Sequence, residues 1–317
     1  MGYGTDNKCQ LNDYKKIVMP LFAFVILHYN TLDDTIECIK SITDNVEYPN
    51  YHIIVVENGS KNNSGIALQQ QYSDHPNTTV LINKQNLGFA KGNNVGYEFA
   101  KYQLKADFIA LINNDTLIYQ QDFITRIVSK HKKGKFHILG PDIISTVDNS
   151  HQNPRDENLD SLESVMKLVK HYQKMLVLNY LFLDVLFVKI KKKFIPGSKL
   201  PRSTTSYSKQ FEEELHNVKL HGSALVFSPD VVKGYDGLYP ETFMYSEESI
   251  LYYIVRRDNL TTVYEPEVKI FHKEDSATDS VFRNKIYKRR FYIKNFILSG
   301  KIFIQLMEKD QKNGRHE

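Results

Sequence analysis

The feature that most constrains the fold of this chain is a set of four short apolar runs in its first 113 residues. Each run is followed directly by polar residues. Runs of this kind are typical of strands buried on both faces of a parallel sheet. Helical patterns lie between them, so the sequence predicts a β-α-β-α-β arrangement with right-handed crossovers. The runs cover residues 21–27, 51–56, 79–83 and 107–113.

Two predicted helices separate these strands. Thr31 and Asp34 offer a capping box at the start of the first, and isoleucines at three-residue spacing follow. The second helix is expected over about residues 93–105. In open sheets of this class, ligands bind beyond the carboxyl ends of the strands. We therefore expect the chemistry of the protein in the residues that follow each strand.

The character of the sequence changes near residue 148, where a polar loop leads into a long amphipathic helical pattern. We interpret this stretch, about residues 150–214, as a helical insertion in a domain that spans 1–275. A basic helical tail, 276–317, completes the 317 residues. The later elements of the domain are strands at 220–228, 262–264 and 268–272 and a helix that begins near Ser246.

Composition limits the class of protein. With 41% hydrophobic and 25% charged residues, disordered, collagen-like and coiled-coil chains are excluded. The two cysteines, Cys9 and Cys38, are too few for a disulfide scaffold or a zinc cage, which favours a reducing cytoplasm. The longest apolar stretch, residues 175–188, is too short to cross a bilayer, and so no spanning helix is predicted.

Two of the strand ends suit a nucleotide. Glu57 is placed to accept hydrogen bonds from a ribose or a base edge, although a merely solvated carboxylate fits the same spacing. Residues 86–96, NLGFAKGNNVG, let the backbone approach a ligand closely before a helix N-terminus. They match neither a Walker loop nor G-x-G-x-x-G, and a generic turn is the alternative.

Acidic residues and one histidine complete the candidates. Asp115, two residues past a buried strand, suffices for a hard divalent ion together with phosphate oxygens, or else forms a turn. Glu247 and Glu248 are adjacent at a helix start, so only one can face a given pocket. A carboxylate beside apolar residues 243–245 with a raised pKa is a candidate general base, or else pairs with the helix dipole. His272, which closes the last strand, completes a metal shell if it faces Asp115.

The ordered motifs FVILHYN, VVENGS, NLGFAKGNNVG, LINNDT, HGSALVF, FMYSEES and IFH resemble those of family 2 glycosyltransferases, particularly the rhamnosyltransferase-like branch of bacterial capsule and O-antigen synthesis. The resemblance covers about residues 20–275 apart from the insertion. It implies a GT-A α/β fold with a mixed sheet flanked by helices. It also implies inverting transfer, dependent on Mg²⁺ or Mn²⁺, from dTDP-rhamnose or a UDP-sugar to a hydroxyl of a lipid-linked glycan.

The resemblance also implies roles for particular residues. The nucleoside pocket would hold Asn30, Glu57 and Asn58, and the donor phosphates and sugar would lie against Asn86, Gly88 and Asn93. The triplet Asn113, Asn114 and Asp115 stands where the family has its D-x-D-like motif, with Asp115 as metal ligand and His272 as its late partner. Glu247 and Glu248 occupy the position of the catalytic Glu-Asp pair, with Glu248 as the base.

Two departures from the family pattern leave a second interpretation open. The catalytic pair is Glu-Glu, and the triplet begins with Asn and so offers a single carboxylate. A catalytically weak homologue that serves as an assembly partner is therefore the alternative. A sugar nucleotidyltransferase is disfavoured because no Gly-rich triphosphate loop precedes the second strand, and a nucleic-acid partner would leave the strand-end motifs unexplained.

Basic residues gather in the insertion and the tail, where they alternate with apolar residues. This pattern is typical of a helix on an anionic membrane surface. It predicts peripheral attachment at the inner face of the cell membrane, with packing in a homodimer interface as the alternative. The residues are Lys167, Lys170, Lys174, Lys189, Lys191, Lys192, Lys193, Lys199 and Arg202 in the insertion, and Arg283, Lys285, Lys288, Arg289, Arg290, Lys294 and Lys301 in the tail.

Overall fold

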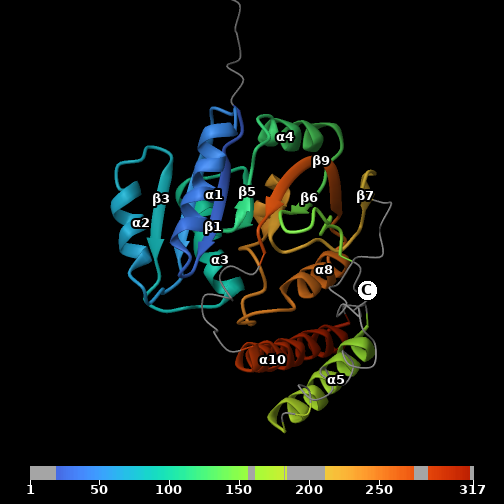
Figure 1. Cartoon of the computed structure of the whole chain (residues 1–317). Helices are drawn as coiled ribbons and strands as arrows, with labels where there is room; N and C mark the ends of the chain where they lie inside the picture. Colours follow the sequence, from blue (N-terminus) through green and yellow to red (C-terminus); the bar gives the residue numbers. More distant parts are fainter. Residues whose placement is uncertain (1–18, 156–160, 182, 184–210, 275–284, 315–317) are drawn as a thin grey trace, which may run out of the picture.

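A mixed β-sheet flanked by helices forms the body of the protein in a computed structural model (Figure 1). The structure describes residues 19–155, 161–181, 183, 211–274 and 285–314. Cys9 and the basic residues from 189 to 202 lie outside them. The strand order is β3-β2-β1-β4-β8-β6-β9-β5, and β7 pairs with β9. The predicted α/β class is thus confirmed.

The four predicted parallel strands form one half of the sheet. Strand β1 pairs with both β2 and β4, and β2 pairs with β3, all in parallel. The interior residues of β1, β2 and β4 are almost completely buried because helices cover both faces of this half. Their bounds are β1 (Phe22–His28), β2 (Tyr51–Glu57), β3 (Thr78–Ile82) and β4 (Phe108–Asn113).

The second half of the sheet is mixed. Strand β8 (Ala224–Phe227) lies antiparallel between β4 and β6 (Ile138–Ser145). One long strand, β9 (Thr262–His272), replaces the two short strands that we expected at 262–264 and 268–272. Strand β9 pairs with β6 along its length, with one shift in register between Pro141 and Asp142 of β6. The short strands β5 (Thr116–Leu117) and β7 (Leu215–His216) pair with β9.

The helices of the first half differ from prediction at their ends. Helix α1 (Leu32–Asn45) has Thr31 as its N-cap, but the expected capping box does not form. The Thr31 hydroxyl instead accepts a hydrogen bond from the side chain of Asn114 at 2.7 Å. The second predicted helix, α3 (Phe89–Glu98), begins four residues earlier than expected and continues as a π-helix, η1 (Phe99–Gln103). The others here are α2 (Ser64–Tyr72) and α4 (Phe123–Lys133).

Two long helices pack against each other and lie below α8 (Glu247–Arg257) in the view of Figure 1. They are α5 (Leu162–Tyr180), from the predicted insertion, and α10 (Lys285–Lys312), from the predicted tail. Apolar residues of both helices pack with α8, which begins next to Ser246, close to the predicted start. The remaining helix is α7 (Pro229–Gly234). Within the described residues, no helix combines the length and apolarity that a membrane span requires.

Candidate active site

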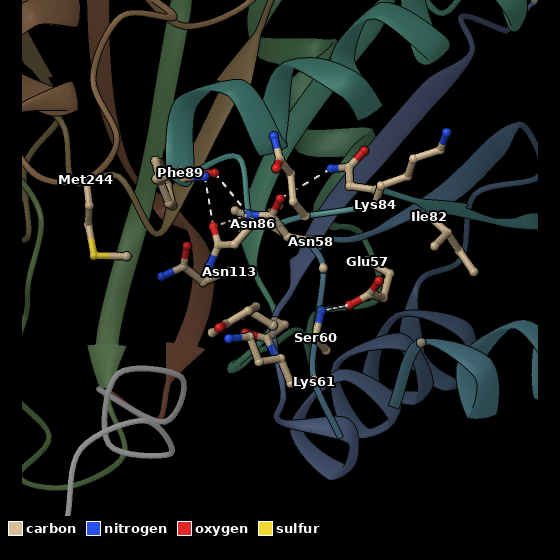
Figure 2. A pocket seen from close by; sticks show the side chains of 18 of the residues that line it. Glu57, Asn58, Ser60, Lys61, Ile82, Lys84, Asn86, Phe89, Asn113 and Met244 are labelled. Carbon is tan, nitrogen blue, oxygen red and sulfur yellow. Dashed lines mark hydrogen bonds between the residues drawn. The ribbon is translucent and has the colours of Figure 1, made fainter. Parts of the chain in front are cut away.

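A cavity of about 930 Å³ lies at the carboxyl ends of β1, β2 and β4, where the strand order predicts a ligand (Figure 2). The segments that follow β1, β2, β3 and β4 line most of it, and the loop before α8, the end of β9 and one residue of α10 complete its wall. In the view of Figure 2, Ile82 and Lys84 lie on one side and Met244 on the other. The predicted residues that line it are Glu57, Asn58, Asn86, Gly88, Asn113, Asn114, Asp115 and His272.

Glu57 is held firmly at the end of β2. Its carboxylate is 4% exposed and accepts a hydrogen bond from the backbone N–H of Ser60 at 2.5 Å. Helix α2 makes room for this side chain with a glycine, because a Cβ at Gly65 would lie 2.5 Å from Glu57 Cγ. The second carboxylate oxygen of Glu57 is left to accept a hydrogen bond from a ligand.

The substitution Gly65→Ala tests this fit. A methyl group at that position displaces the Glu57 side chain, so we expect about tenfold weaker binding of UDP or dTDP, with about 1–3 kcal/mol lost from the free energy of unfolding. Calorimetric titration and thermal denaturation measure the two effects. Gly134→Ala is the matched control, since no atom lies within 4 Å of the place its new methyl group would take and its φ is not positive. Equal nucleotide affinity in both variants would contradict the assignment of Glu57.

Asn58 and Asn86 fold the glycine-rich loop around the N-terminus of α3. The Asn58 amide donates to the Gly88 carbonyl at 3.0 Å, and Asn86 Oδ1 accepts from the Gly88 N–H at 2.8 Å. Gly88 has φ +84, and a Cβ there would lie 2.2 Å from the Phe243 carbonyl oxygen. That oxygen accepts a hydrogen bond from the Phe89 N–H at 2.7 Å. Gly88 is therefore required because the backbone of the loop before α8 packs directly against it.

The loop before α8 connects two distant parts of the chain. Tyr245 and Ser246 both have φ 70, a left-handed conformation that is rare outside glycine. The ring of Tyr245 stacks on Phe296 of α10 with centroids 4.8 Å apart, and the Ser299 hydroxyl donates to the Met244 carbonyl at 2.8 Å. Helix α10 therefore holds this loop, and with it Met244, against the cavity.

Asp115 and His272 meet as predicted, although one lies after β4 and the other ends β9. Their Oδ1 and Nε2 atoms are 3.2 Å apart, and both side chains are almost fully buried. The Gln152 amide donates to Glu274 at 2.8 Å, and its oxygen therefore faces His272 Nδ1, also at 2.8 Å. His272 Nδ1 therefore donates to Gln152, and Nε2 is the ring nitrogen that lies beside Asp115.

This pair suits a divalent cation. Asp115 Oδ1 is buried and has no hydrogen-bond partner among the described residues. A buried carboxylate oxygen without a partner beside an imidazole nitrogen offers two ligand atoms of the kinds that divalent cations bind. Within the described residues there is no group of three or more His, Cys, Asp or Glu that could bind a metal. Any further ligands would have to include phosphate oxygens or water.

Glu247 and Glu248 diverge, as their adjacency on a helix predicts. Glu247 is buried and accepts a hydrogen bond from the Thr242 hydroxyl at 3.0 Å. Burial raises its pKa to about 7, and the negative charge of Glu248 adds to this effect. The raised pKa that we predicted for a carboxylate beside residues 243–245 thus belongs to Glu247.

Glu248 lies in a different environment from Glu247. A quarter of its side chain is exposed, and its Oε1 accepts from the Gly222 N–H at 2.6 Å. Burial acts to raise the pKa of Glu248, but His221, Arg155, Lys219 and this N–H outweigh it, and the pKa lies below its ordinary value. An ionised, accessible carboxylate can accept a proton. His221 lies between Glu248 and the Asp115–His272 pair. Its Nδ1 is 3.9 Å from Glu248 Oε1, and its ring centroid is 5.9 Å from that of His272.

The structure does not bring every predicted residue to the cavity. Asn30 lies in the turn after β1, where its N–H donates to Ser60 at 2.9 Å, and the Asn93 amide donates to the Phe89 carbonyl within α3. Neither is among the described residues that line the cavity, and the predicted catalytic residues Glu247 and Glu248 are not among them either. Other lining residues were not predicted. Tyr29, Lys61, Ile82 and Lys84 could have been found from their places beside strand ends, whereas nothing local marks Phe291 of α10.

Comparison with known proteins adds evidence to this geometry. The chain is 20% identical over 326 residues to the low-salt glycan biosynthesis hexosyltransferase Agl10 of Haloferax volcanii, and the match covers 95% of this chain and 89% of that protein. The glycosyl transferase family 2 sequence model matches residues 23–188.

Solved structures resemble the fold at low sequence identity. S. aureus TarS 1–349 in complex with UDP-GlcNAc superposes with a TM-score of 0.51 at 12% identity, over 81% of this chain and 59% of that one. The chain thus spans about 60% of that TarS chain. The mannosyltransferase PcManGT from Pyrobaculum calidifontis, in complex with GDP-Man and Mn²⁺, has a TM-score of 0.51 at 10% identity, over 91% and 73%. These likenesses confirm the predicted GT-A fold, and the family match covers more than half of the chain. The protein belongs to glycosyl transferase family 2 and is a glycosyltransferase.

Proposed function

We propose that this enzyme transfers a sugar with inversion from a nucleotide-diphospho-sugar, dTDP-rhamnose or a UDP-sugar, to a hydroxyl of a lipid-linked glycan. The rhamnosyltransferase-like motifs favour a role in capsule or O-antigen synthesis. The observation that carries the proposal is the buried Asp115–His272 pair, whose Oδ1 and Nε2 atoms lie 3.2 Å apart at the wall of a cavity large enough for such a donor.

The cavity offers a place for each part of the donor. Glu57 would accept a hydrogen bond from the nucleoside, with Asn30 and Asn58 supporting its loops. Asn86, Gly88 and Asn93 would organise the loop beside the phosphates and the sugar. Lys61 and Lys84, which line the cavity, supply positive charge for a diphosphate. Neighbours of the same fold support this assignment, because TarS is solved with UDP-GlcNAc and PcManGT with GDP-Man.

Asp115 and His272 would hold Mg²⁺ or Mn²⁺, with Asn113 and Asn114 shaping the same loop. A bound divalent ion neutralises charge that develops on a leaving diphosphate. Gln152 accepts a hydrogen bond from His272 Nδ1 and so fixes the orientation of that ring. The Mn²⁺ that accompanies GDP-Man in PcManGT supports the use of a divalent metal here.

Glu248 would act as the general base. The carboxylate takes the proton of the acceptor hydroxyl while that oxygen attacks the anomeric carbon on the face opposite the diphosphate. The bond from the anomeric carbon to the phosphate oxygen breaks, and its electron pair leaves with the nucleoside diphosphate. Glu247 would help to position Glu248, because its hydrogen bond with Thr242 anchors the first turn of α8, to which both residues belong.

A panel of nucleotide sugars, scored for donor hydrolysis with Mg²⁺, with Mn²⁺ and with EDTA, tests the proposal. We expect turnover of dTDP-rhamnose or of a UDP-hexose only with a metal ion. Binding of nucleotides without hydrolysis or transfer of any donor would favour the alternative, a weak homologue that acts as an assembly partner. Turnover in EDTA would contradict the metal site.

The layer of α5 and α10 fits attachment to a membrane surface. Val177 and Leu181 of α5 are 59% and 60% exposed, and Lys170 and Lys174 are exposed on the same helix. Lys294 of α10 is exposed too and lies 5.6 Å from the ring of Tyr180. We propose that residues 1–275 form the catalytic domain and that its insertion and the tail dock peripherally on the inner face of the cell membrane. A lipid-linked acceptor would then meet the cavity from that side.

Vesicle co-sedimentation tests this attachment. We expect binding to vesicles that contain phosphatidylglycerol, weakening with salt, and little binding to pure phosphatidylcholine. Val177→Glu should reduce binding several-fold because it places a charge in the contact surface. Val147→Glu is the matched control, since Val147 is 57% exposed in the turn after β6. A stable homodimer without vesicle binding would support the alternative role of these helices.

A further inference from the structure

A five-residue segment at the start of the predicted insertion, His151–Arg155, lies against the reacting end of the site. By its sequence it is predicted only as part of a polar loop. Gln152 contacts His272, and Arg155 contacts Glu248. The segment therefore touches both the proposed metal end and the proposed base, which lie far from it in the sequence.

Hydrogen bonds to the sheet fix the path of this segment. Asn153 is 2% exposed, and its amide donates to the Pro141 carbonyl at 2.8 Å while its oxygen accepts from the His221 N–H at 3.1 Å. The Arg155 N–H donates to the Lys219 carbonyl at 2.9 Å. The position of Arg155 is thus fixed by its backbone hydrogen bond to Lys219 and by the buried side-chain amide of Asn153.

Arg155 faces the outer oxygen of the Glu248 carboxylate. Its Nε lies 3.7 Å from Glu248 Oε2, and about a quarter of each side chain is exposed. The inner oxygen, Oε1, is held by the Gly222 N–H. An ion pair at this distance lies beyond hydrogen-bond range, so the charge of Arg155 acts on Oε2 without occupying its lone pairs.

We infer that Arg155 is a positioning residue for the proposed base, holding the Glu248 carboxylate ionised and pointed at the acceptor while leaving Oε2 open to a hydroxyl. This inference rests on the proposed function of Glu248. Other charged groups also face this carboxylate: His221 from the turn before β8, Lys219 behind it and Glu247 beside it. Burial lowers the pKa of His221 to about 4, so that this ring is neutral near pH 7, whereas Arg155 keeps its positive charge and lies 3.7 Å from Glu248 Oε2.

The sign of the pH effect follows from the pairing. Arg155 lowers the pKa of Glu248, so its removal lets burial raise that pKa and the base becomes protonated at a higher pH. Arg155→Met keeps most of the side-chain volume. We expect its rate of hydrolysis of dTDP-rhamnose and of UDP-glucose, relative to the unmodified enzyme, to fall about tenfold as the pH is lowered from about 8 to about 6. Arg155→Lys should restore the original profile.

Three comparisons make the test decisive. Arg126→Met removes an arginine paired with Asp122 and Glu267 on α4, away from the cavity, and should leave the pH profile unchanged. Equal Mn²⁺ and UDP affinity in Arg155→Met and the unmodified enzyme shows that the donor end is intact. A loss that is the same at every pH, or a lysine variant as slow as the methionine variant, overturns the inference. Normal activity of Glu248→Gln would instead refute the proposed base itself.

Discussion

Replacing Glu248 by glutamine is expected to lower sugar transfer by about 10²- to 10⁴-fold, the usual contribution of a general base. Glutamine keeps the hydrogen bond from the Gly222 N–H, so the helix start should fold as before. It cannot accept a proton from the acceptor hydroxyl. The loss should therefore fall on kcat, while the affinity for the nucleotide sugar, measured by calorimetry, stays the same.

The matched control for this variant is Glu267→Gln. Glu267 is largely exposed and pairs with Arg126, outside the cavity. We expect its transfer rate to match that of the unmodified enzyme. If Glu248→Gln transferred sugar at the control rate in a purified assay, Glu248 would not be the base. A large loss of donor affinity would equally refute its placement on the acceptor side.

The second large effect is expected from Asp115→Asn. Asp115 supplies the carboxylate that lies 3.2 Å from His272 Nε2, and the neighbouring triplet residues are asparagines. A neutral amide would weaken binding of a divalent ion and leave the charge on the leaving diphosphate less compensated. We expect at least about 10²-fold slower transfer, because a metal contributes several kcal/mol to charge stabilisation in the transition state.

Binding of Mn²⁺ separates this effect from misfolding. Electron paramagnetic resonance in the presence of UDP should show free Mn²⁺ with Asp115→Asn and bound Mn²⁺ with Asp122→Asn. Asp122 pairs with Arg126 and lies outside the cavity. The two variants should differ little in Tm. Unchanged Mn²⁺ binding by Asp115→Asn would exclude Asp115 as a ligand, whatever happened to its activity.

The parallel half of the fold was predictable because β1, β2 and β4 are buried on both faces and therefore form apolar runs in the sequence. Strand β6 was not predicted, although it lies in the same sheet, since Gly140, Pro141 and Asp142 interrupt its apolar pattern. Asp142 is tolerated there because its carboxylate pairs with His151 at 2.7 Å. A contact of this kind is tertiary and leaves no periodic signal in the sequence.

The candidate site divides in the same way. Glu57 and Asp115 follow strands, so the topological rule finds them without any knowledge of their contacts. Gln152 and Arg155 act on partners that are 120 and 93 residues away in the chain. Their polar loop is ordinary by composition, and only the fold shows that it reaches His272 and Glu248.

The left-handed pair Tyr245 and Ser246 has a consequence for the cavity. Such residues each store about 1–3 kcal/mol of backbone strain, which persists only while surrounding contacts hold them. The contacts here come from α10, through the ring of Phe296 and the hydroxyl of Ser299. The strained conformation of this loop therefore depends on its contacts with α10. The shape of the cavity wall at Met244 thus depends on a helix that lies more than 40 residues further along the chain.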